Sequence, residues 1–260
     1  MRAALPGLVL LGLALLPGTA GGPALAQNRA ESRAALPGLG ATDRRVPVDV
    51  AQDPWRSVGK VQTNLGGRCT GALVAPRLVL TAAHCLFNPR TQAMLPASSL
   101  HVLFGYQRGE YRTHVTVERY ISDPAFDGRK NRGRLSPDNA HVDWALLVLA
   151  PAPAVAEPVL PLVAKPLPAG TPLTLGGFNQ DRSHLMLADP ACTILGWGNF
   201  PNGAPMMLHD CSATRGTSGG PILARRDGRW EVIGINVGAS PGANLALPAA
   251  AFAAEAAKLH

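Results

Sequence analysis

The sequence has few charged residues, few aromatic residues and no long helical pattern. Only 16% of its residues are charged whereas 47% are hydrophobic, so the chain is too apolar to stay disordered and long enough to bury a core. Four cysteines in 260 residues are too few for a small disulfide scaffold. Glycine (28) and proline (24) form about a fifth of the chain, which argues against a helical bundle and predicts many turns between short strands.

Basic clusters and metal-ligand motifs are also missing. The formal net charge is +7, but no run of five or more cations and no basic stripe with interleaved aromatics occurs. Nucleic-acid-binding surfaces carry such stripes, so no nucleic-acid partner is expected. No C-x₂-C or H-x₃-H spacing is present, so no metal site is expected, and no cofactor motif appears.

A long apolar run occurs only at the N-terminus. Arg2 precedes an apolar stretch from Ala3 to Leu16, and small residues ending in Ala24-Leu25-Ala26 follow. This is the three-part pattern of a secretory signal, and the stretch is shorter than the ~20 residues of a spanning helix. Residues 1–26 are therefore predicted to be a signal peptide. The mature chain is expected to be secreted or periplasmic, without a membrane partner after cleavage.

The rest of the chain has the pattern of a β protein. Residues 27–45 are small and polar and predict a linker or pro-segment. From Val46 to His260, short β-type runs alternate with turn residues, and Asp227-Gly228 between two runs predicts a hairpin. Several strands at this spacing favour a sandwich or barrel. The helix formers that follow Pro248 predict a C-terminal packing helix over residues 249–260.

Three short clusters carry the residue types of nucleophilic catalysis. They occur in the order Thr81-Ala82-Ala83-His84-Cys85, Asp143-Trp144-Ala145-Leu146-Leu147 and Gly216-Thr217-Ser218-Gly219-Gly220-Pro221. Each alone has an ordinary structural explanation. Together they supply a nucleophile, a base and an orienting acid, because a serine hydroxyl is activated when an imidazole takes its proton and a carboxylate holds the imidazole tautomer. Glycines beside the serine let backbone N–H groups approach an oxyanion.

These motifs resemble those of the trypsin/chymotrypsin-type serine endopeptidases. The resemblance covers about Val46 to His260 and is closer to bacterial, glutamyl-endopeptidase-like members than to animal trypsins. It implies an all-β protease domain over 46–260, built of two antiparallel six-stranded β-barrels with the active site in the cleft between them, plus the C-terminal helix. The first barrel is expected at about 46–150 and the second at about 170–247, joined by a proline-rich surface linker.

The resemblance also implies a role for each catalytic residue. His84 would be the general base and acid, Asp143 its orienting partner, and Ser218 the nucleophile that forms an acyl-enzyme with a polypeptide substrate. The backbone N–H groups of Gly216 and Ser218 would form the oxyanion hole. No cofactor is implied, and a monomer is expected.

The specificity pocket follows from the same resemblance. Ser212, six residues before the nucleophile, would form the pocket floor, and Asn236, Val237 and Gly238 would line its wall. Because none of these is charged, a neutral residue at the cleaved position is expected rather than a strictly tryptic or glutamyl preference. Asp210 is the residue that would overturn this expectation by reaching the pocket.

Two disulfides fit the resemblance. Cys69 and Cys85 are 16 positions apart and flank the strand before His84, where the family commonly has a bridge. Cys192 and Cys211 are 19 positions apart and would pair near the specificity pocket. Metal binding through cysteine and histidine is the weaker alternative.

The sequence departs from the animal enzymes before the nucleophile. Those enzymes carry an acid where this chain has Thr217, and the acid pairs with a new N-terminal ammonium after zymogen cleavage. Arg44-Arg45 precedes Val46 at nearly the zymogen cleavage spacing, but Thr217 cannot supply a counter-ion. Removal of residues 27–45 is therefore not expected to activate the enzyme through an ion pair. Alternatively, Arg44-Arg45 is an exposed basic pair in a flexible segment.

Two other features of the second barrel concern its extent. Only 75 positions separate Asp143 from Ser218, which predicts trimmed loops. Two glycine-aromatic runs could open the second barrel, and Leu175-Gly176-Gly177-Phe178 is favoured over Leu195-Gly196-Trp197-Gly198 because it is nearer the linker.

Two other function classes remain as alternatives. A catalytically silent relative acting as a secreted binding protein would normally lack the histidine or the serine, and this chain keeps both. An α/β-hydrolase esterase would share the G-x-S-x-G pattern of Gly216–Gly220, but it requires the order serine, acid, histidine and alternating strands and helices.

Overall fold

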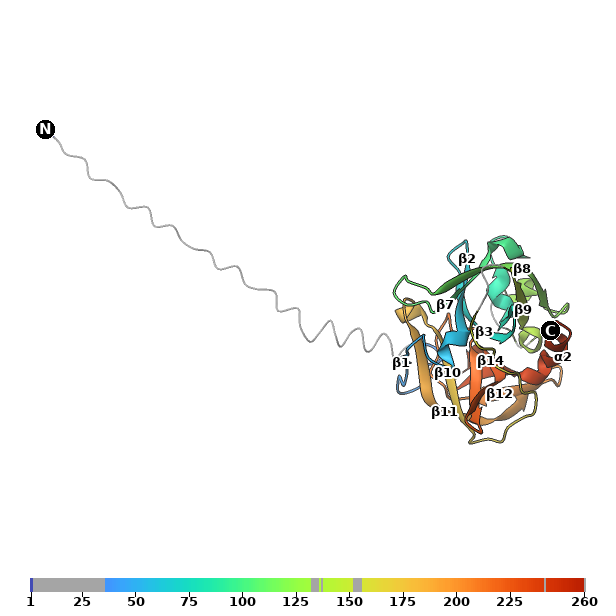
Figure 1. The fold of residues 1–260 in the computed structure, drawn as a ribbon. Coiled ribbons are helices and arrows are strands. Elements are labelled where there is room, and N and C mark those ends of the chain that lie inside the picture. The colour runs from blue at the N-terminus through green and yellow to red at the C-terminus, as the bar shows by residue number, and fades with distance from the viewer. Residues whose placement is uncertain (2–35, 132–135, 137, 152–155, 241, 260) are drawn as a thin grey trace.

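The computed structural model describes residues 1, 36–131, 136, 138–151, 156–240 and 242–259. Apart from Met1, the predicted signal peptide lies outside the described residues, as does the part of the predicted linker before residue 36. Within the described part, β-strands dominate and helices are short (Figure 1).

The first barrel is a closed ring of antiparallel strands in the order β2-β3-β4-β9-β8-β7. Its strands are β2 (Val58–Thr63), β3 (Arg68–Ala75), β4 (Leu78–Thr81), β7 (Leu100–Phe104), β8 (Thr113–Ser122) and β9 (Ala145–Leu149). A small sheet of β5 (Phe87–Asn88) and β6 (Ala93–Met94) lies outside this ring. Apolar side chains fill the barrel because inward and outward positions alternate along each strand.

The second barrel closes in the order β11-β10-β13-β14-β15-β12, because β12 also pairs with β11, and β1 adds to β11 at the outside. The elements are β1 (Val46–Pro47), β10 (Pro172–Phe178), β11 (Met186–Asn199), β12 (Pro205–His209), β13 (Pro221–Arg226), β14 (Arg229–Ser240) and β15 (Ala243–Pro248). The two-barrel prediction is thus confirmed. β10 opens the second barrel and contains the favoured run Leu175–Phe178.

The predicted hairpin is also present. Asp227 and Gly228 connect β13 to β14, with φ angles of 49° and 78°. Positive φ at both central residues is the condition of the type I′ turn, whose twist matches that of the flanking strands.

The helical elements of the described residues are 3₁₀ turns and one α-helix. The turns are η1 (Trp55–Ser57), η2 (Ala83–Leu86), η3 (Ala97–Ser99), η4 (Gly128–Asn131), η5 (Ala140–Val142), η6 (Gln180–Arg182) and η7 (Ala249–Ala251). The C-terminal helix is shorter than predicted, because η7 is followed at Phe252 by a non-helical φ of −136° before α2 (Ala253–Ala257) begins. The Phe252 side chain is fully buried, and its ring centroid lies 6.4 Å from that of Trp144. Docking this ring interrupts the helix.

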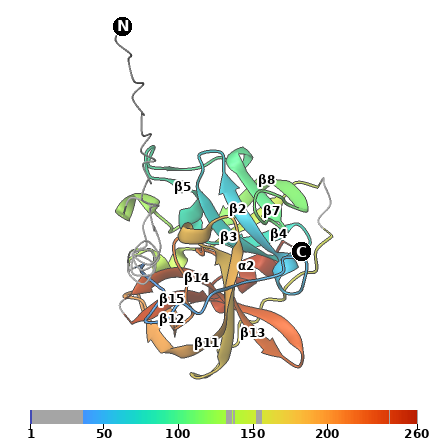
Figure 2. The ribbon, with the colours of Figure 1, turned by 90° about the vertical axis from the view of Figure 1, so that its left-hand side faces the viewer.

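The two barrels lie one above the other in both ribbon views (Figures 1 and 2). One buried cluster includes residues of both, such as Leu80 of β4 and Phe178 of β10. The segments that carry His84, Asp143 and Ser218 follow β4, precede β9 and lie between β12 and β13. The fold therefore brings three distant parts of the chain to the junction of the barrels.

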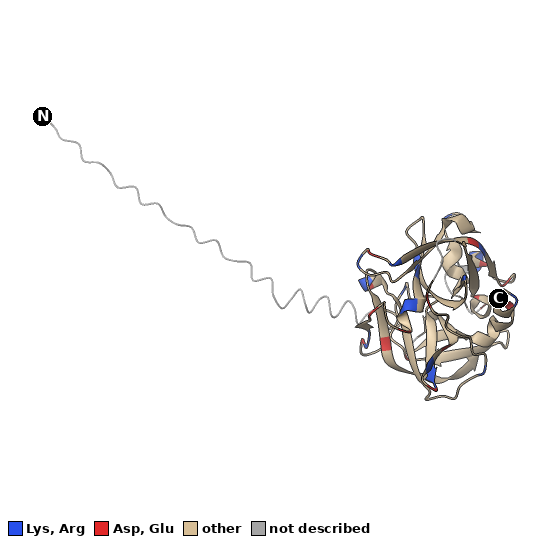
Figure 3. Ribbon diagram, in the orientation of Figure 1, with Lys and Arg blue, Asp and Glu red and all other residues tan. Residues whose placement is uncertain are grey.

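The surface carries mixed charge. Basic and acidic residues of the described chain are scattered over both barrels (Figure 3). Among the described residues, no helix is long and apolar enough to cross a membrane.

Candidate active site

His84 and Asp143 are joined by two contacts. The Nδ1 atom of the His84 ring lies 2.6 Å from Oδ2 of Asp143, and the backbone N–H of His84 donates to Oδ1 at 2.8 Å. The Asp143 side chain is almost fully buried, whereas that of His84 remains 17% exposed. A carboxylate held at both oxygens fixes the orientation of the ring and leaves Nε2 as the nitrogen free to exchange a proton.

The electrostatics of this pair favour a protonatable ring. Burial disfavours the charged imidazole, but the charge of Asp143 and its hydrogen bond outweigh that effect and raise the pKa of His84 above its usual value of 6.5. A raised pKa strengthens the ring as a proton acceptor, which is the property that a general base needs.

Ser218 borders the same cavity as His84. The cavity has a volume of about 560 Å³, and Ser218, His84 and Gly216 all line it. The structure contains no hydrogen bond between the Ser218 hydroxyl and the His84 ring. Such bonds are often long in unliganded enzymes and tighten when substrate binds. The three predicted catalytic residues are thus brought together, with the acid and base already in contact.

Ser218 lies in the loop of residues 210–220 between β12 and β13, called the nucleophile loop below. Two carbonyl groups of this loop set the direction of the N–H groups that follow them. The Arg215 carbonyl accepts the N–H of Gln180 at 2.7 Å, and the Thr217 carbonyl accepts that of Gly220 at 2.8 Å. In a trans peptide the following N–H points the opposite way. The N–H groups of Gly216 and Ser218 therefore point away from Gln180 and Gly220, the residues that donate to these carbonyls. Neither N–H group donates a hydrogen bond within the described residues.

Gly216 itself is required by space and by backbone geometry. Its φ is +96°, and a Cβ there would collide with the carbonyl oxygen of Phe178. Only glycine adopts such a φ without strain.

Thr70 in β3 ties the first barrel to the nucleophile loop. Its N–H donates to the carbonyl of Ser218 at 2.9 Å. Its hydroxyl donates to the carbonyl of Gly216 at 2.8 Å and accepts the N–H of Phe178 at 3.0 Å. No local sequence motif indicates the role of Thr70, because its partners lie more than 100 positions away.

Asn179 holds the same loop from the second barrel. Its Oδ1 accepts hydrogen bonds from the N–H and the hydroxyl of Thr214, both at 3.1 Å, and from the hydroxyl of Thr217 at 3.0 Å. Its own amide donates to the carbonyl of Gly177. No motif indicates the role of Asn179 either, although this residue directly follows the run Leu175–Phe178.

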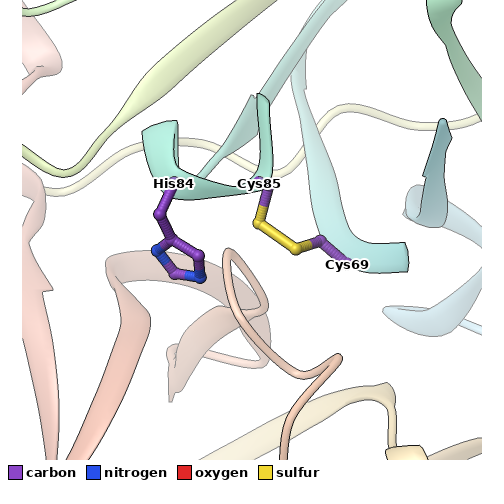
Figure 4. Close-up of side chains that lie close together, drawn as sticks. All are labelled: Cys69, His84 and Cys85. Carbon is purple, nitrogen blue, oxygen red and sulfur yellow. A yellow bond between two sulfur atoms is a disulfide. The ribbon is translucent and has the colours of Figure 1, made fainter. Parts of the chain in front are cut away.

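Both expected disulfides are present. Cys69 is bonded to Cys85, and Cys192 to Cys211. Figure 4 shows the first bond beside the His84 ring. Cys69, His84 and Cys85 are close enough to resemble a metal site, but the two sulfur atoms are bonded to each other and provide no thiolate ligand.

The expected pocket residues fall into two groups. Asn236, Val237 and Gly238 line the cavity together with His84. Ser212 does not line it and is only 2% exposed. Asp210 lies 3.2 Å from Arg44 and accepts the N–H of Thr193 at 2.6 Å.

Arg44 and Arg45 are both engaged in ion pairs. The Arg44 side chain contacts the fully buried carboxylate of Asp189 at 3.0 Å. The Arg45 side chain is only 1% exposed and pairs with Asp43 at 2.8 Å and Asp181 at 2.9 Å. The alternative that these residues form an exposed basic pair is therefore wrong, because acidic groups of the second barrel bind them.

Comparison with known proteins places this site in a family. The trypsin-like peptidase domain matches residues 69–235. The chain belongs to the trypsin-like peptidase domain family. Among its relatives are mouse serine protease 56, 29% identical over 197 residues, and human tissue-type plasminogen activator, 28% identical over 229 residues. These alignments cover 67% and 72% of this chain but 30% and 38% of the relatives. The chain thus spans about a third of the length of these two relatives.

Solved structures of similar fold include bacterial proteases. A Glu endopeptidase in complex with MPD has a TM-score of 0.63 at 19% identity, covering 83% of this chain and 97% of that one. The VesB protease of Vibrio cholerae has a TM-score of 0.60 at 21% identity, covering 83% and 66%. At these identities the similarity defines the fold of this trypsin-like peptidase domain.

Proposed function

We propose that the chain is an exported serine endopeptidase that uses Ser218 as nucleophile, His84 as general base and acid, and Asp143 as the group that orients His84. The observation that carries the proposal is the two-point contact between His84 and Asp143 at a cavity that Ser218 also lines. Export is supported by the two disulfides, which persist in oxidising compartments.

In the proposed reaction each of these groups has a defined role. Nε2 of His84 takes the Ser218 proton while Oγ attacks the substrate carbonyl carbon, forming a carbon–oxygen bond. The negative oxygen is stabilised by the N–H groups of Gly216 and Ser218. His84 then gives the proton to the leaving amine as the peptide C–N bond breaks. Water hydrolyses the resulting acyl-enzyme by the same route, with His84 again as base.

A fluorophosphonate probe tests the proposal directly, because such probes label only activated serines. The purified protein is expected to be labelled at Ser218 and to cleave an unstructured protein such as casein. Ser218→Ala should abolish labelling and lower kcat on the order of 10⁶-fold. Ser98→Ala, at an exposed serine, is the matched control and should behave as the parent.

The competing function is that of a secreted binding protein with an inactive site. In that case the protein would remain unlabelled at any pH at which it is folded. Labelling at another serine would contradict the assignment of Ser218 and leave the family membership intact.

A further inference from the structure

Residues 37–39 lie against the part of the second barrel that was expected to form the pocket floor. The carbonyl oxygen of Gly38 accepts the N–H of Ala213 at 2.9 Å and the side-chain amide of Asn244 at 2.8 Å. The carbonyl oxygen of Leu39 accepts the hydroxyl of Ser212 at 3.1 Å. Leu39 is buried whereas Pro37 is exposed, so the segment is anchored in the domain at Leu39 and presents Pro37 at the surface.

The close approach of the segment depends on a glycine. Gly38 has a φ of +92°, and a Cβ at this residue would collide with the carbonyl oxygen of Ala213. Both the backbone conformation and the available space therefore exclude other residues. The contact between Gly38 and Ala213 is therefore specific to a glycine at this position.

The chain that follows residues 37–39 is fixed by an ion pair between Arg44 and a buried carboxylate. Arg44 pairs with Asp189, and the Asp189 carboxylate also accepts the N–H of Ser212 at 2.7 Å. Since Asp189 is fully buried, removing its cationic partner would leave an uncompensated charge. Ser212 is thus held from two sides, by Leu39 at its hydroxyl and by Asp189 at its N–H.

The segment changes which residue faces the substrate. Ser212, the position expected at the floor, is covered and does not line the catalytic cavity, whereas Pro37 does. Ala213 and Asn244, which bind the carbonyl of Gly38, line the cavity beside Pro37. The substrate side chain would therefore meet Pro37 before it could reach Ser212.

We propose that Pro37, anchored by Gly38 and Leu39, forms the floor of the primary specificity pocket and restricts it to peptides with a short, uncharged side chain at the cleaved position. This inference rests on the proposed endopeptidase function and assigns a specificity role to a segment that lies before the first barrel.

The chemistry of the lining supports this substrate class. Around Pro37 the cavity is lined by small or neutral side chains, namely Ala213, Asn236, Gly238, Ala239 and Asn244. The cations that also line it, Arg68 and Arg215, are exposed. A floor without a charge cannot compensate the desolvation of a buried lysine, arginine or glutamate side chain.

The decisive experiment compares two variants, one with a carboxylate on the proposed pocket floor and one with a carboxylate outside the cavity. In the full chain, Pro37→Asp should raise kcat/KM for peptides with arginine or lysine at the cleaved position about tenfold relative to alanine peptides, through one partly solvated ion pair. Ala41→Asp is the matched control, because Ala41 is exposed and lies outside the catalytic cavity. It should leave the peptide preference unchanged.

Two outcomes would overturn the inference. An unchanged preference in Pro37→Asp would exclude Pro37 from the pocket, and an equal shift in both variants would show a long-range charge effect. Fluorophosphonate labelling of every variant separates these outcomes from failure of the endopeptidase function, because a labelled protein with an unaltered preference contradicts only the pocket floor.

The variant Gly38→Ala tests whether the segment forms the pocket floor or blocks the active site. If the segment is a floor, dislodging it should admit bulkier side chains and selectively raise kcat/KM for leucine and phenylalanine peptides. A uniform rise for all peptides would mean that the segment blocks the site, and would overturn the inference. A profile identical to that of the parent would do the same.

Discussion

The hydroxyl of Thr217 donates a hydrogen bond of 3.0 Å to Oδ1 of Asn179. Thr217 directly precedes Ser218, the proposed nucleophile, at the position where the animal enzymes carry an acid that pairs with an ammonium. Here a neutral amide accepts the threonine hydroxyl and two further bonds from Thr214. Neutral groups therefore hold this part of the nucleophile loop, and we expect its geometry to be independent of a newly cut N-terminus.

The first prediction concerns this contact. Thr217→Val removes the hydroxyl at nearly constant shape and should destabilise the protein by about 1–3 kcal/mol, because the interaction with Asn179 is buried. The same change should lower kcat/KM, since the loop carries the proposed oxyanion donors. Thr217→Ser keeps the hydroxyl and is the control. Urea unfolding and peptide hydrolysis measure both effects, and equal behaviour of the two variants would contradict the role of the hydroxyl.

The second prediction concerns the pH dependence of activity. The pKa of His84 is raised because the charge and hydrogen bond of Asp143 outweigh the effect of burial. The imidazole must be neutral to act as base, so kcat/KM should fall as pH drops through a value above 6.5. Asp143→Asn should shift this fall to lower pH and reduce kcat on the order of 10⁴-fold. A pH profile of the variant that coincides with the parent profile would exclude Asp143 as the partner of His84.

The third prediction concerns Arg45. Arg45→Met should destabilise the domain by about 2–4 kcal/mol, because the carboxylates of Asp43 and Asp181 lose a cation that is 1% exposed. Arg90→Met changes an exposed arginine and should have an effect within about 0.5 kcal/mol. Chemical denaturation at pH 7 compares the two, and similar small losses would show that the Arg45 network contributes little.

Added trypsin offers a second test of this network. Since the Arg45 side chain is inaccessible, trypsin should cleave slowly after Arg45 under native conditions. Cleavage should become rapid in Arg44→Ala, because this change removes the ion pair that holds the neighbouring chain to Asp189. Mass spectrometry of timed digests identifies the cleavage site. Immediate cleavage after Arg45 in the parent protein would contradict its burial.

The fourth prediction concerns His209. Burial lowers its pKa to about 4, against smaller opposing effects of Asn236, Asp210 and Asp189. Between pH 6.5 and 4 the unfolded chain binds a proton that the folded protein does not, so stability should fall as pH falls through this window, by about 3 kcal/mol. His209→Gln should remove this contribution, whereas His184→Gln, at an exposed residue, should keep it. Urea midpoints at pH 7 and pH 4.5 measure the difference.

The fifth prediction concerns the disulfides. Opening the Cys192–Cys211 bridge by double substitution with serine should destabilise the domain by about 3 kcal/mol, the chain-entropy value for a loop of this size. Non-reducing peptide mapping of the parent should recover both bonded pairs. A peptide linking Cys85 to Cys192 would refute the pairing.

Local sequence determined the main features of the fold and the types of residues at the site. Strand-length apolar runs, Asp227-Gly228 at the hairpin and the motifs around His84, Asp143 and Ser218 are each encoded within a few consecutive residues. Such signals can be read directly, because turn geometry and nucleophile chemistry require particular residues at fixed short spacings.

Tertiary structure alone decided what holds the nucleophile loop and what forms the pocket floor. Thr70 reaches Gly216 across 146 positions, and Arg44 reaches Asp189 across 145. Pro37 lines the cavity although it precedes both barrels, and Ser212 is covered although its spacing from Ser218 pointed to the floor. No periodicity carries these contacts, since a single hydrogen bond or ion pair between distant segments depends on how the closed barrels bring their loops together.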